Sequence, residues 1–194
     1  MPEEIEVDTD KLREAIDEEI EKESASLLRL IALTTAFFAA LAALGSLLAG
    51  GTINEALALK TEATQKQAQA SDQWAYYQAK GIKAAIVETQ KQLLASDGKS
   101  APPDLDKTIQ RYADEQKAAG AQAQELEKVR DQKDDEANEL IHRHHFYAYS
   151  VAMLQISIAL GAVAALTRKR PVWWGSSALG LLGALLCLGT WAAG

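Results

Sequence analysis

The residues best suited to metal chemistry are a glutamate and three histidines that lie close together in the sequence. Glu139 and His142 are three residues apart and would share a face of a helix, and His144 and His145 follow at once. Di-metal sites in helical bundles use such a Glu-x-x-His pair, but they need it twice, together with two more carboxylates. The chain has it once, although an oligomer would supply copies. These four residues are therefore weak metal candidates, and we favour a polar collar beside an apolar segment.

No other pattern predicts catalysis. The sequence contains no nucleophile elbow, P-loop, dinucleotide-binding fingerprint or zincin motif, and its serines have no local partner pattern. The formal net charge is -7, and the one basic run is short, which argues against binding of nucleic acid. We therefore expect no enzyme, and we assign no catalytic residue, no cofactor and no cofactor-binding residue.

Hydrophobic residues make up 48% of the chain, and they cluster in three segments. Each segment approaches the roughly 20 apolar residues that cross a hydrocarbon core of about 30 Å, and no charged residue lies inside Leu30–Ala49, Phe146–Leu166 or Val172–Trp191. The pattern predicts an all-α membrane protein in contact with the lipid bilayer. Its three transmembrane helices are expected at 27–51, 146–166 and 172–191, with a basic loop at 167–171.

Residues 1–26 precede the first apolar segment and are acidic, with apolar residues at helical spacing. They predict an acidic amphipathic helix, for which contact with protein is favoured over contact with anionic lipid. A cleavable signal peptide begins with basic residues, so the first apolar segment is expected to remain as an anchor.

The polar stretch 52–145 predicts a long antiparallel helical hairpin, similar to a coiled coil. Gly98 and the prolines that follow interrupt it near 95–104 and leave two arms of similar length. Both arms have their bases at the membrane, as a helical hairpin requires. At its start, Gly50-Gly51 is expected to loosen the helix, and Thr52 to restart it through a capping box.

The hairpin register follows from its turn. If the turn centres near Lys99, the numbers of paired residues add to about 198. Ile86 is then expected opposite Tyr112, and Leu93 opposite Leu105. The bulky rings of one arm are expected to pack on small residues of the other; this packing set is Trp74, Tyr77, Ala119, Gly120 and Ala123.

Three residues of the same stretch are expected to point away from that interface. They are Asp72, Tyr76 and Lys80, and they are candidates for contact with a partner, either a second copy or another membrane protein.

The basic loop predicts the orientation in the membrane. Arg168, Lys169 and Arg170 form the densest positive charge beside an apolar segment, which places this loop in the cytoplasm. The N-terminus is then cytoplasmic as well, and the hairpin lies on the opposite side. Arg143, with the histidines around it at the hairpin base, is the contrary signal.

The apolar segments contain few polar residues: Thr34, Thr35, Ser46 and Gln155 are the ones we single out. Transporters and pumps carry ionisable residues at membrane depth, and these segments have none. For Gln155 we favour a hydrogen bond to a neighbouring helix.

Several strings in the sequence are similar to those of a known family. ALTTAFFAALAALGSLLAG, NEAL, ASDQWAYYQAKGIK and IALGAVAALTRKRPVWW resemble the uncharacterised bacterial domain-of-unknown-function family 4337, and the resemblance extends from about Ile31 onward. It implies a small multi-pass protein of the bacterial inner membrane with a helical insert. It implies no activity and no substrate.

Three hypotheses follow. The first is a homo-oligomeric structural or scaffolding assembly whose hairpins form a stalk. The second is an oligomeric channel or pore lined by the polar residues of the apolar segments. The third is a metal-binding sensor or enzyme that uses the glutamate and the histidines.

Overall fold

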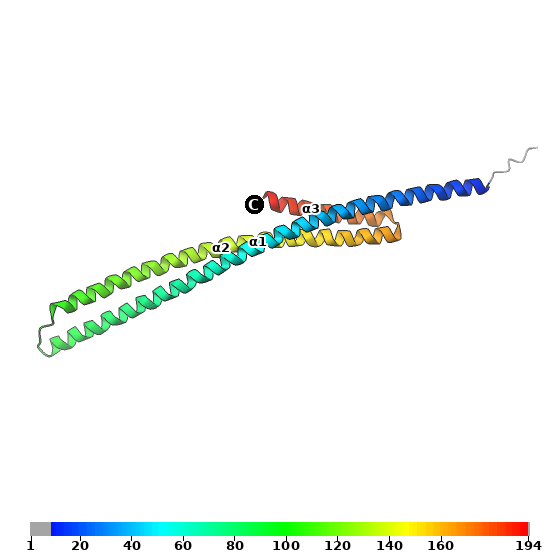
Figure 1. Cartoon of the computed structure of the whole chain (residues 1–194). Coiled ribbons are helices and arrows are strands. Elements are labelled where there is room, and N and C mark those ends of the chain that lie inside the picture. Colours follow the sequence, from blue (N-terminus) through cyan, green and yellow to red (C-terminus); the bar gives the residue numbers. More distant parts are fainter. Residues whose placement is uncertain (1–8, 194) are drawn as a thin grey trace, which may run out of the picture. The chain divides into compact units, whose positions relative to one another are not determined.

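The chain is all helical, as predicted. The computed structural model describes the backbone of residues 9–193 and the side chains of residues 13–193. These residues form three helices and no strand: α1 (Thr9–Ser96), α2 (Pro103–Thr167) and α3 (Arg170–Ala192) (Figure 1). The expectations for residues 1–8 lie outside the described residues.

The chain divides into two compact units. The apolar unit contains the chain up to Thr52 and from His142 onward, and the hairpin unit contains Ile53–Ile141. Within the hairpin unit, α1 and α2 run side by side in opposite directions (Figure 1).

A helix-ending motif closes α1 and begins the turn. Gly98 adopts a positive φ of 68°, a conformation that glycine reaches without steric cost. The amide of Gly98 donates to the carbonyl of Ala95 at 3.1 Å, and the amide of Lys99 donates to that of Leu94 at 2.9 Å. These two bonds form a Schellman motif, which satisfies carbonyls at the end of the helix.

Alanine forms the buried seam of the hairpin. On α1, the buried residues Ala56, Ala63 and Ala70 recur every seven positions, and on α2 Ala119 and Ala137 are buried. A seven-residue repeat keeps one face of a helix against its partner. Because alanine is small, the two backbones approach closely along this face.

Polar pairs flank the alanine seam and fix its register. The numbers of the residues in each pair add to between 194 and 201, a range that includes the predicted 198. The pairs are Lys60–Asp134, Lys60–Asn138, Glu62–Lys133, Gln67–Arg130, Trp74–Glu127, Lys80–Glu115 and Lys91–Asp106.

Two apolar residues of α1 do not lie where the sequence predicts. Ile86 and Leu93 are each 62% exposed, so neither is buried against α2. The seam follows the seven-residue series through Ala56, Ala63 and Ala70, which continues to positions 84 and 91. Ile86 and Leu93 lie two positions beyond 84 and 91, so their side chains point about 200° around the helix from the seam.

The expected restart of α1 at Thr52 is also wrong. The helix is continuous from Thr9 to Ser96, and the Thr52 hydroxyl donates to the carbonyl of Ala49 at 2.9 Å instead of capping a new helix. Glycine costs a helix only about 1 kcal/mol relative to alanine, so Gly50 and Gly51 do not break it.

In the apolar unit, three helical segments pack around small clusters of buried apolar side chains. Phe38 and Ala42 of α1 are buried against Leu154 of α2, and Leu27 and Ile31 form a second cluster with Ala164. Glycine makes room for the largest of these side chains, because the Phe38 ring occupies the space that a side chain at Gly180 of α3 would need.

Two glycines of α3 give a matched test of this packing. Gly180→Ala is expected to lower the free energy of unfolding by about 1–3 kcal/mol, because the new methyl group overlaps the Phe38 ring. Gly175→Ala is expected to be neutral or to stabilise α3 by up to about 1 kcal/mol, because nothing lies within 4 Å of an added Cβ. Thermal unfolding in mild detergent measures both, and equal effects would contradict the packing described.

Candidate functional site

The histidines near the base of the hairpin have separate surroundings. The His142 ring packs edge-on against Phe146, with centroids 5.0 Å apart. The Nδ1 of His144 lies 2.9 Å from the carbonyl oxygen of Ala49 and donates to it. The rings of His144 and His145 lie 5.9 Å apart, and His145 and Glu139 are exposed. Among residues 13–193, no three His, Cys, Asp or Glu side chains gather in a way that would hold a metal.

The structure brings the aromatic packing set together. The rings of Trp74 and Tyr77 meet edge-on with centroids 5.4 Å apart. A Cβ placed on Gly120 would lie 3.2 Å from the Tyr77 ring and 3.9 Å from that of Trp74. Ala119 and Ala123 are buried on the same arm. Gly120 is therefore needed where two large rings face α2.

Glu127 completes this cluster, and sequence reasoning missed it. The indole Nε1 of Trp74 donates to the Glu127 carboxylate at 2.9 Å. Indole has one polar group, which needs a partner when the ring is half buried. Next to the rings, the small residues of α2 leave a groove of about 440 Å³, whose polar lining includes Gln116, Lys117 and Gln124.

Lys80 does not point away from the hairpin interface, so the direction predicted for it is wrong. Its ammonium group pairs with Glu115 of α2, and its side chain is only 13% exposed. The same Nζ lies 4.7 Å from the centroid of the Tyr76 ring and 5.3 Å from that of Tyr112. The long lysine stem reaches across the interface from a flanking position. Asp72 and Tyr76 are exposed and remain available to a partner.

The ion pairs across the hairpin shift the pKa values of their members. The hydrogen bond from Lys80 lowers the pKa of Glu115, and the same bond raises the pKa of Lys80. In a second pair, the hydrogen bond from Lys60 lowers the pKa of Asp134. Each shift favours the charged form in the folded hairpin.

These shifts predict a loss of stability in acid. A carboxylate with a lowered folded-state pKa stabilises the fold above its ordinary pKa, 4.5 for Glu115, and this contribution is lost as the pH falls through the folded-state value. Glu115→Gln is therefore expected to lower the melting temperature at about pH 7 and to change it little at about pH 3. Far-UV circular dichroism of the full chain in detergent measures this difference.

An exposed glutamate on the same helix provides the control. Among residues 13–193, Glu125 pairs only with Lys128, three residues along α2, and both side chains are exposed. Glu125→Gln should leave the melting temperature nearly unchanged at both pH values, because exposed pairs of this kind contribute little. A Glu115→Gln effect that persists undiminished in acid would contradict the role given to the ion pair.

The polar residues of the apolar segments divide into two groups. The Thr34 hydroxyl accepts a hydrogen bond from the Trp173 indole at 3.2 Å, and the Thr35 hydroxyl donates to the Ile31 carbonyl at 2.8 Å. Ser46 and Gln155 are exposed. The hydrogen bond predicted for Gln155 is absent from the part of the chain that the structure describes, so that interpretation is wrong within one chain.

Three serines that the sequence analysis did not single out hold α2 to α3. The Ser150 hydroxyl donates to the Gly183 carbonyl at 2.8 Å. Ser157 and Ser176 exchange hydrogen bonds, since each hydroxyl donates to the backbone carbonyl of the other residue at 2.7 Å. All three are buried. The seven-residue spacing of Ser150 and Ser157 was the available signal, because it places both hydroxyls on one face of α2.

The basic loop is tied to the start of α1. Arg168 has a positive φ of 53°, and Arg168 and Lys169 are exposed. The guanidinium of Arg170 pairs with Glu23, which belongs to the acidic segment before the first apolar stretch. The acidic segment thus contacts the first residue of α3 within the apolar unit.

Comparison with known families identifies the family to which the chain belongs. The model of the family described as Domain of unknown function (DUF4337) matches residues 27–193. The chain belongs to this family. No curated protein and no solved structure matches it. Membership in the DUF4337 family carries no activity, so function must be argued from the surfaces described above.

Proposed function

We propose that the protein crosses a bilayer three times and assembles with copies of itself into a structural or scaffolding complex, in which the hairpin units form a stalk. Support for crossing comes from three helices that are long and apolar enough to span a membrane. The proposal includes no enzymatic activity.

The same proposal includes a location and an orientation. The protein resides in the bacterial inner membrane, with the N-terminus and the 167–171 loop in the cytoplasm and the hairpin unit on the opposite side. The exposed cations Arg168 and Lys169, together with Arg170, support this orientation because short cytoplasmic loops are enriched in Lys and Arg.

The observation that carries self-assembly is an apolar stripe on the outer face of α1. Ile82, Ile86 and Leu93 are 61–62% exposed, in a unit whose surface is otherwise largely polar. They continue a series with alternating spacings of four and three that also contains Ala75, Ala79 and Thr89. This is the spacing of a coiled-coil seam, and α2 does not cover it. Its side chains border a groove of about 510 Å³.

A second copy of the chain is the occupant we propose for this stripe. Contiguous exposed apolar surface on a water-facing helix marks an interaction site. Apolar side chains from the partner subunit would remove the stripe from water by the same packing that a two-stranded coiled coil uses.

Gln155 supports assembly within the apolar unit as well. It lies in an exposed series with Ala148, Ala152, Ala159 and Ala162, again spaced alternately by four and three. Small residues at this spacing allow helices to approach closely in lipid. An amide is both donor and acceptor, so Gln155 and Gln155 of the partner subunit can satisfy each other.

The stripe is tested by its effect on oligomer mass. Paired Ile82→Gln and Ile86→Gln changes are expected to shift the full-length chain in mild detergent toward the monomer, with roughly tenfold or greater loss of association. Light scattering coupled to size-exclusion chromatography measures the mass.

The control changes lie on another face of the same two turns of α1. Glu88→Gln together with Gln92→Ala replaces exposed polar residues away from the stripe and should leave the mass unchanged. A monomeric wild-type protein would refute self-assembly, whereas an unaltered oligomer in the isoleucine variant would refute the role of the stripe in it.

A pore between copies is the second candidate, and one observation favours it. Ser46 and Gln155 expose polar groups from otherwise apolar segments. The hydroxyls of Thr34 and Thr35 are engaged within the chain, so they are weaker candidates for lining a pore. If a pore exists, ion flux through liposomes should fall when Gln155 is changed to Leu; an unaltered flux would remove Gln155 from this role.

A further inference from the structure

One face of α2 carries residues at seven-residue intervals that lie against α3. Ser150 bonds to Gly183 and Ser157 bonds to Ser176, and the numbers in each pair add to 333. Arg143 is the residue seven positions before Ser150. The same register places Arg143 opposite Thr190, in the last turn of α3.

Arg143 differs from the serines because no side chain or carbonyl among residues 13–193 pairs with it. Its Nε is buried and has no hydrogen-bond partner, and no carboxylate among residues 13–193 forms an ion pair with its guanidinium. Guanidinium is always charged and offers five N–H donors. A cation that is partly removed from water and left without an acceptor is costly.

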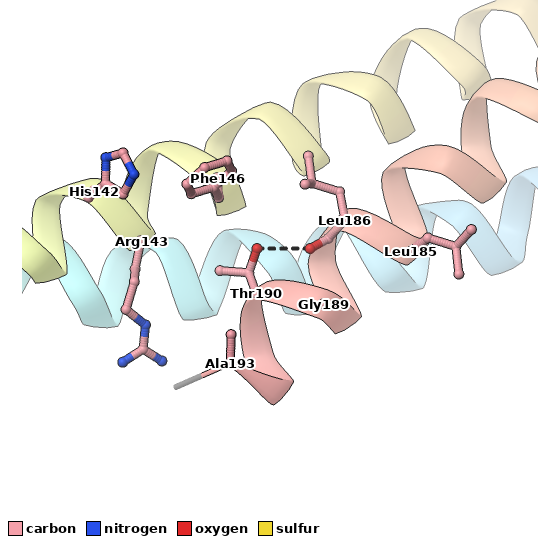
Figure 2. A pocket seen from close by; sticks show the side chains of 8 residues that line it. All are labelled: His142, Arg143, Phe146, Leu185, Leu186, Gly189, Thr190 and Ala193. Carbon is pink, nitrogen blue, oxygen red and sulfur yellow. Dashed lines mark hydrogen bonds between the residues drawn. The ribbon is translucent and has the colours of Figure 1, made fainter.

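A groove of about 370 Å³ begins at this arginine. Its walls come from Phe146 of α2 and from Leu185, Leu186 and Gly189 of α3, so it is almost entirely apolar. Figure 2 shows Arg143 extending from α2 toward Ala193 at the end of α3, and the His142 ring on the other side next to Phe146. Thr190 adds no free donor, because its hydroxyl is bonded to the Leu186 carbonyl at 2.8 Å.

The position of the groove suits the boundary between hydrocarbon and headgroups. α3 ends at Ala192, and the exposed ring of Trp191 lies in its last turn. On α2, Tyr149 is also exposed, two turns or less from Arg143. Trp and Tyr concentrate where chains leave the hydrocarbon core, which is the depth of lipid phosphates.

We propose that this groove binds one anionic phospholipid, with its phosphate on the guanidinium of Arg143 and an acyl chain along Phe146, Leu185 and Leu186. An arginine fork matches phosphate oxygens in charge and geometry. The apolar walls match an acyl chain, which a free phosphate does not have. This inference rests on the bilayer-crossing part of the proposed function and is independent of self-assembly.

Two variants separate the charge from the groove. Arg143→Gln removes the cation. Gly189→Leu fills the groove, and the fold should accept it because nothing lies within 4 Å of an added Cβ. Arg168→Gln is the matched control, since it removes one exposed cation in the loop at the other end of α3.

The experiment is native mass spectrometry of the full-length chain in mild detergent, titrated in parallel with phosphatidylglycerol, phosphatidylcholine and inorganic phosphate. The wild type is expected to retain one phosphatidylglycerol per protomer in preference to phosphatidylcholine. Arg143→Gln should bind phosphatidylglycerol roughly tenfold more weakly, as expected for loss of a charged hydrogen bond. Gly189→Leu should lose both lipids, and Arg168→Gln should match the wild type.

Any of three results would overturn the site: equal retention of the two lipids by the wild type, an Arg143→Gln variant that binds like the wild type, or inorganic phosphate that competes as well as the lipid. A preference lost only in Arg168→Gln would assign it to the loop instead. Flotation with liposomes separates the two proposals. A chain that does not float refutes bilayer crossing, whereas one that floats without the lipid preference refutes only this site.

Discussion

The close approach of two helix backbones is the constraint on which the hairpin depends. Alanine occupies the buried seam of α1 at Ala56, Ala63 and Ala70, and larger side chains would hold the arms apart. So narrow a seam buries little apolar surface per residue, and its hydrophobic contribution is correspondingly small. Pairs such as Lys60–Asp134 at its edges select the register without adding much stability. Trp74 and Tyr77 are the exception, and they fit because Gly120 gives them space.

The same constraint explains why large apolar residues lie outside. A seam that accepts alanine has no room for Ile82, Ile86 or Leu93, so these residues point away from α2. The hairpin thus carries two faces with the spacing of a coiled coil, one closed by its own second arm and one open. The helices of the apolar unit are joined differently. Buried serines form hydrogen bonds between α2 and α3, and Gly180 leaves space for the Phe38 ring.

The sequence was sufficient to predict helices, their break near Gly98 and a register close to the one observed, because each follows from local chemistry or from the lengths of the arms. It was insufficient to predict which face of α1 is buried nearer the turn, around Ile86 and Leu93, although the face that carries Trp74 and Tyr77 was predicted correctly. A search for large apolar residues favours Ile86 and Leu93, whereas the seam is marked by small ones. Lys80 was misassigned because its Cα lies at the edge of the interface while its flexible stem crosses to Glu115. For Gln155 a partner inside the chain was expected, and the structure shows none among the described residues. A polar residue in an apolar segment indicates a hydrogen bond but not whether its partner is in the same chain.

The exchanged hydrogen bonds of Ser157 and Ser176 also select against slippage of α3 along α2. If α3 slipped by one seven-residue repeat in one direction, Ser176 would face Ala164, which offers no hydroxyl in return. If it slipped in the other direction, Ser176 would meet Ser150 and a serine pair would form again, but Ser157 would face Lys169, at the end of the loop. Either error leaves one serine hydroxyl without its reciprocal partner. A repetitive, glycine-rich helix such as α3 would otherwise have several nearly equivalent alignments, and this pair makes one of them the most stable.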